Sequence, residues 1–187
     1  MAKKKQQEEE VLVDVAQSLG RAEKWFEENQ KTIIGAVAAI FILVGGYFAY
    51  DTYYQEPREK EALEEIFFAQ QYFELDSLNT ALAGDGQHYG FEDIAANYSG
   101  TKAGNLAQYY AGISYLNLGD FENAIKYLDA FKSDDPIFSV LASGSIGDAF
   151  LELNQMSEAL EYYTKAVDGK TNSTVVPVYL QRGAIIA

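Results

Sequence analysis

The sequence predicts an all-α protein, with a single N-terminal transmembrane helix followed by a solenoid of helical repeats. Three observations support this fold class. Residues 32–50 carry no charged side chain, residues 8–29 have the apolar spacing of a surface helix, and two C-terminal segments align at a constant offset of 35 residues. We therefore divide the chain into an N-terminal segment, 1–31, a membrane span, 32–50, and an outer domain, 51–187.

The N-terminal segment contains one predicted amphipathic helix. Its apolar residues recur at spacings of three and four, which places them on one face: Leu12, Val15, Leu19, Ala22 and Phe26. This face could lie along the inner membrane surface or on a partner, or the helix could be solvated without a partner. The sequence leaves these alternatives open.

The uncharged run is long enough to cross a bilayer. At about 1.5 Å of rise per residue it reaches roughly 28 Å, close to the thickness of the hydrocarbon core. A buried helix of a soluble domain is the alternative. A cleaved secretory signal does not fit, because the preceding 31 residues contain seven acidic groups and no A-x-A site ends the run. We expect a retained anchor.

Positive charge on the N-terminal flank indicates the orientation of the span. Residues 1–31 carry six Lys and Arg residues, whereas the nearest cations on the other side are Arg58 and Lys60. Cationic flanks stay cytoplasmic, so the outer domain should lie outside. Small residues within the span could allow close helix contact in lipid, although they are common in all spans. The predicted docking face consists of Gly35, Ala39, Gly45, Gly46 and Ala49.

The outer domain is strongly acidic and the chain lacks cysteine. Residues 51–187 hold 21 of the 28 acidic and 8 of the 14 basic side chains. Such a surface repels nucleic acid and anionic headgroups, and favours a basic or neutral protein partner. Without cysteine there is no disulfide, thiolate metal site or cysteine nucleophile.

The outer domain contains an internal repeat. GISYLNLGDFENAIKYL at 112–128 aligns with GDAFLELNQMSEALEYY at 147–163. Each segment predicts two antiparallel helices, and small residues, Gly112 with Ala124 and Gly147 with Ala159, stand where the paired helices must approach. Gly119 can end the first helix of the first unit, where Asn154 replaces it in the second.

This pattern resembles the tetratricopeptide repeat, a unit of about 34 residues. Gly112, Tyr115, Gly119, Ala124 and Pro136 match its consensus in one unit, and the match is good in the next. The repeats are predicted at 105–138 and 140–170.

Two further units flank these repeats. Residues 59–100 form a degenerate repeat, with a helix over 59–82, a loop at 84–87 and a second helix over 91–98. Residues 176–187 restart a first helix, and Gly183 aligns with the repeated glycines. An uncapped solenoid would expose its core, so we expect the natural chain to continue beyond residue 187.

No residue pattern predicts catalysis. The single histidine, His88, lies in the loop 84–90 with no expected partner, and no phosphate-binding, dinucleotide or zinc pattern occurs. The acidic residues Asp134, Asp135, Glu158 and Glu161 are expected to be solvated. We predict no catalytic residue, no cofactor and no metal, and a protein that is not an enzyme.

The family resemblance implies a peptide-binding groove lined by the first helix of each unit. On this sequence it selects Tyr109, Ile113, Leu116, Asn117, Gly144, Asp148 and Glu152. Rings, an amide and carboxylates would suit an extended or helical peptide, although tyrosines at this spacing are as often packing residues.

The whole arrangement, with WFEENQK at 25–31 before the span, resembles the YfgM-type ancillary subunits of the bacterial SecYEG translocon. The resemblance implies an inner-membrane protein whose periplasmic repeats cooperate with a PpiD-type membrane-anchored chaperone as exported polypeptides emerge. Alternatives are another envelope scaffold, serving outer-membrane protein assembly or cell division, an enzyme, or a eukaryotic organelle protein.

Overall fold

The computed structural model describes residues 2–168 and 175–186, and side chains are described at residue 20 and from residue 23 onward. Every regular element in this part of the chain is helical, so the predicted all-α class is confirmed. The chain divides into two units, Met1–Thr52 and Tyr53–Ala187.

The first unit is a single helix. α1, Ala2–Tyr50, joins the two predicted helices without a break. Among the described residues, one helix is long and apolar enough to cross a membrane, and its apolar stretch is entirely uncovered. Leu12, Val15, Leu19 and Ala22 lie outside the described side chains, so the amphipathic face stays a prediction. A π-helical turn, η1 (Asp51–Gln55), precedes the helices of the second unit.

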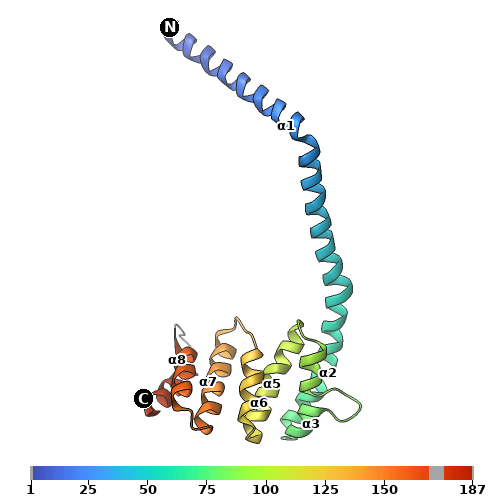
Figure 1. The fold of residues 1–187 in the computed structure, drawn as a ribbon, viewed down its shortest axis with the longest axis vertical. Helices are drawn as coiled ribbons and strands as arrows, with labels where there is room; N and C mark the ends of the chain where they lie inside the picture. The colour runs from blue at the N-terminus through green and yellow to red at the C-terminus, as the bar shows by residue number, and fades with distance from the viewer. Residues whose placement is uncertain (1, 169–174, 187) are drawn as a thin grey trace. The chain divides into compact units, whose positions relative to one another are not determined.

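Figure 1 shows the second unit as a row of helices. Three of them, α2 (Glu56–Glu74), α5 (Lys102–Leu118) and α7 (Pro136–Glu152), are the long first helices of successive pairs. The others are α3 (Leu78–Ala83), α4 (Phe91–Asn97), α6 (Phe121–Ala130), α8 (Met156–Val167) and α9 (Val176–Ile186). Neighbours α5 to α9 pack in chain order, as the predicted antiparallel pairs require.

The three first helices end in the same way. A left-handed residue follows each, Asp76 (φ 57°), Gly119 (φ 80°) or Asn154 (φ 58°). In each case its N–H and the next N–H bond back to carbonyls of the last turn, which is a Schellman motif. The predicted continuous helix over 59–82 is therefore wrong. The chain turns after Leu75, which is exposed rather than part of the core.

Small residues bring the paired helices together. A Cβ atom on Gly112 would lie 2.5 Å from Leu128, and one on Gly147 would lie 2.6 Å from the Tyr163 ring. Ala124 and Ala159, on the second helices, are completely buried. The close approaches predicted from the repeat are confirmed.

Tyrosines contribute to packing both between helix pairs and within one. Tyr110 stacks on Phe91 at 5.2 Å, and Tyr115 stacks on Tyr127 at 5.5 Å. The hydroxyls of Tyr115 and Tyr127 both donate to the same carboxylate oxygen of Glu92 on α4. Burial is the main cause that raises the pKa of Tyr127 to about 12. These three tyrosines thus pack against the first core cluster of the solenoid.

Candidate partner-binding site

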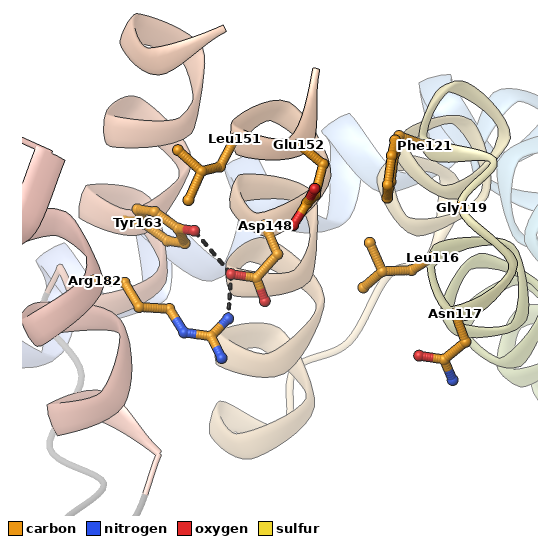
Figure 2. Close-up of a pocket in the computed structure, with 9 residues that line it drawn as sticks. All are labelled: Leu116, Asn117, Gly119, Phe121, Asp148, Leu151, Glu152, Tyr163 and Arg182. Atoms are coloured by element: carbon orange, nitrogen blue, oxygen red, sulfur yellow. Dashed lines mark hydrogen bonds and ion pairs between the residues drawn. The ribbon is translucent and has the colours of Figure 1, made fainter. Parts of the chain in front are cut away.

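A hollow of about 570 Å³ opens between the end of α5 and the helices α7, α8 and α9 (Figure 2). The α5 turn supplies apolar and amide groups to one wall, and α7 supplies two carboxylates to the other. The lining residues are Leu116, Asn117, Gly119, Phe121, Asp148, Leu151, Glu152, Tyr163 and Arg182. The site therefore combines apolar surface with acidic groups.

The α5 wall depends on the turn after Gly119. Because the left-handed residue reverses the chain there, α6 starts at once and places Phe121 beside Leu116. Asp120 caps α6 by accepting the N–H of Asn123 at 3.2 Å. Asn117 stands exposed at the edge of this wall.

Asp148 on α7 is the polar centre of the opposite wall. It accepts the Tyr163 hydroxyl at 2.8 Å and forms an ion pair with Arg182 of α9 (Figure 2). The Arg182 guanidinium also lies 5.4 Å from the centre of the Tyr179 ring. The hydrogen bond with Asp148 is the main cause that raises the pKa of Arg182. One carboxylate thus joins three successive helices.

The structure brings four of the seven predicted groove residues together: Leu116, Asn117, Asp148 and Glu152 line the hollow. Asp148 and Glu152 are four residues apart on α7, about one helical turn. Whether these four bind a partner stays a prediction.

The other three predicted groove residues lie in packing contacts. The Tyr109 ring lies 5.2 Å from Phe131 and 5.3 Å from Phe138, and burial is the main cause that raises its pKa to about 12. Ile113 packs against the core cluster of Leu128. Gly144 is buried where a Cβ would lie 2.1 Å from the Tyr179 ring. These positions face neighbouring helices rather than the hollow.

The family pattern did not select Arg182. It directly precedes Gly183, and the residues before the aligned glycines, Ala111 and Ile146, are buried and apolar. An arginine at a position that is apolar in both repeats is the sequence signal that could have identified it.

His88 has partners that the sequence did not reveal. Its ring stacks on Phe68 at 3.6 Å, and Nδ1 lies 3.5 Å from a Glu65 oxygen that also accepts the N–H of Tyr89. His88 lies in a loop, as predicted, and this loop folds back on α2 so that the ring contacts Phe68 and Glu65. Within the described residues, no group of three or more His, Asp or Glu side chains is arranged to hold a metal ion.

The predicted docking face in α1 is uncovered. Outside the helix itself, no described atom lies within 4 Å of a Cβ built on Gly35, Gly45 or Gly46. Ala39 and Ala49 are exposed as well. The use of this face stays a prediction.

Comparison with known proteins identifies the repeat itself. Two models of the tetratricopeptide repeat match, one over residues 106–136 and the other over residues 142–168. No curated protein and no solved structure matches the chain. The matched segments correspond to α5–α6 and α7–α8, whose first helices border the hollow. The outer domain therefore carries tetratricopeptide repeats, a module that binds proteins.

Proposed function

We propose that the protein is a membrane-anchored tetratricopeptide-repeat scaffold that holds a protein partner in the hollow between α5 and α7. One observation carries the proposal: the first helices of two matched repeats border a hollow with apolar, amide and carboxylate groups. Stacked repeats bind partners along such surfaces without bond chemistry.

The proposed location is the bacterial inner membrane, with the N-terminus in the cytoplasm and the repeats in the periplasm. The excess of Lys and Arg before the span supports this orientation. Resemblance in architecture and in the 25–31 motif supports a place beside the SecYEG translocon, with a PpiD-type chaperone as partner. The anchor would then act by raising the local concentration of the repeats around emerging chains.

Photo-cross-linking in native membranes tests both parts of this proposal. A photoreactive amino acid replaces Asn117, which is exposed at the edge of the hollow, or Glu161, which is exposed on α8 and does not line it. We expect the Asn117 variant alone to form adducts with a translocon subunit or a membrane-anchored chaperone. Equal adducts at both positions, or none at either, contradict the proposal that the hollow holds the partner. Adducts containing only outer-membrane assembly or division proteins contradict the translocon assignment and favour another envelope scaffold.

A further inference from the structure

The two carboxylates of the hollow differ in how they are compensated. Asp148 accepts a hydrogen bond from Tyr163 and pairs with Arg182. Glu152, one turn further along α7, is exposed, and no hydrogen bond or ion pair joins it to another described residue. Figure 2 shows both carboxylates on the side of α7 that borders the hollow. Glu152 is therefore the carboxylate of the hollow that can pair with a charged group of a ligand.

The charge balance of the hollow favours a cation over an anion. An anionic ligand would meet two carboxylates, and the one guanidinium in the lining is already paired with Asp148. A cation meets the unpaired Glu152 instead, and the acidic outer domain attracts it from a distance.

The apolar lining further restricts the chemical class of ligand that fits the hollow. Leu116 and Leu151 lie in the walls with Glu152, so a ligand group should combine an aliphatic stem with a cationic end. Lysine and arginine side chains have this form. The Asn117 amide offers both a donor and an acceptor, which complements a peptide group of the same ligand.

We propose that the hollow binds a lysine or arginine side chain of an extended, partly apolar segment of the partner. The aliphatic stem lies on Leu116 and Leu151, and the cationic end pairs with Glu152. This inference rests on the proposed function, because it specifies the chemistry of the partner that the same hollow holds.

Peptide binding to the full chain tests the inference. The protein is placed in nanodiscs of uncharged phosphatidylcholine, so that cationic peptides have no anionic lipid to bind. Fluorescence anisotropy then compares labelled apolar peptides that carry Lys, Gln or Glu at one central position. A partly exposed charge pair predicts roughly fivefold tighter binding of the Lys peptide than of the Gln peptide at moderate salt. Glu152→Gln should bring this ratio close to one.

The matched control is Glu161→Gln, which removes the same charge from an exposed site on α8 outside the lining. It should keep the preference for the Lys peptide. A preference unchanged by Glu152→Gln, or tighter binding of the Glu peptide, overturns the inference and leaves the scaffold proposal standing. If none of the peptides binds, the hollow is not a peptide-binding site and both proposals are overturned.

Discussion

Three glycines at the equivalent position of successive repeats have different packing environments. Gly112 faces the Leu128 side chain and backbone, and Gly147 faces the Tyr163 ring, both closer than a Cβ atom allows. At Gly183 the nearest atoms to an added Cβ are 3.5 Å and 3.8 Å away, an ordinary contact. The repeat needs glycine at the first two positions and tolerates a methyl group at the third.

Alanine substitutions should separate these positions. Gly147→Ala forces the Tyr163 ring to move in a packed seam, so we expect the free energy of unfolding to fall by about 1–3 kcal/mol. Gly183→Ala, the matched control, should leave it unchanged or raise it by about 1 kcal/mol, because alanine is the better helix former. Chemical denaturation of the full chain in detergent measures both. Equal losses in the two variants would contradict the packing difference.

Asp85 illustrates a residue whose role depends on local backbone geometry. It accepts the N–H groups of Gln87 and His88 at 2.8 Å and 2.7 Å, and the Tyr72 hydroxyl at 2.9 Å. The backbone hydrogen bonds lower its pKa from 3.8 to about 2. The sequence placed Asp85 in a turn-rich loop, but only the folded loop shows that three donors meet this carboxylate.

The lowered pKa of Asp85 predicts acid sensitivity of the loop. Because the folded pKa is depressed, the stabilisation is complete above pH 3.8 and is lost as the pH falls toward 2. Carboxyl-detected NMR of the full chain in micelles should give a midpoint near 2 for Asp85, and the Gln87 and His88 amide signals should shift with it. A midpoint at 3.8 or above would contradict this geometry.

At the scale of the helix, the shared ends of α2, α5 and α7 explain where the sequence-based boundaries succeeded and failed. Gly119 is a familiar helix terminator, and the repeat alignment transferred that role to Asn154. Apolar spacing does not reveal the same motif at Asp76, because the apolar Leu75 directly precedes it and this helix end usually carries glycine or asparagine. Apolar spacing alone could not distinguish a helix from a helix and its following turn.

The left-handed backbone at the end of α7 predicts opposite effects on stability for two substitutions of Asn154. Asn154→Gly should raise the free energy of unfolding by about 0.5 kcal/mol, and Asn154→Ala should lower it by about 1 kcal/mol, since the left-handed region penalises a Cβ without a local polar contact. Gln155→Ala, at a φ of −98°, is the adjacent control and should have a smaller effect than Asn154→Ala. Denaturation midpoints of the three variants give the order, and an alanine variant as stable as the glycine variant would contradict it.

At the scale of the molecule, the sequence predicted the helical repeats and one membrane-crossing segment, but only part of the hollow. The family resemblance, applied through the aligned glycines, selects Leu116, Asn117, Asp148 and Glu152, whereas Arg182 comes from α9, outside the two aligned units. Register gives the side of a helix on which a residue lies. It does not give the partner that a long side chain selects across a gap.

Cysteine labelling can test the proposed membrane orientation, because the chain contains no cysteine. Single substitutions Lys4→Cys and Asn117→Cys place a thiol on either side of the 32–50 segment. In spheroplasts, a membrane-impermeant maleimide should label Asn117→Cys, since positive charge retains the N-terminal flank inside. Lys4→Cys should react only after lysis. The reverse pattern would contradict the orientation.

The chain-order packing of the helices has a consequence for how the outer domain forms. The buried members of its first core cluster all lie between Ala62 and Ala111, and the helix pairs with the most extensive packing are neighbours along the chain. Such local topologies fold quickly and can propagate from one end. A chain made from its N-terminus can therefore bury this first core before α7 exists. The hollow also includes Arg182 of α9, which pairs with Asp148 in its wall, so the hollow is complete only after this last described helix has docked.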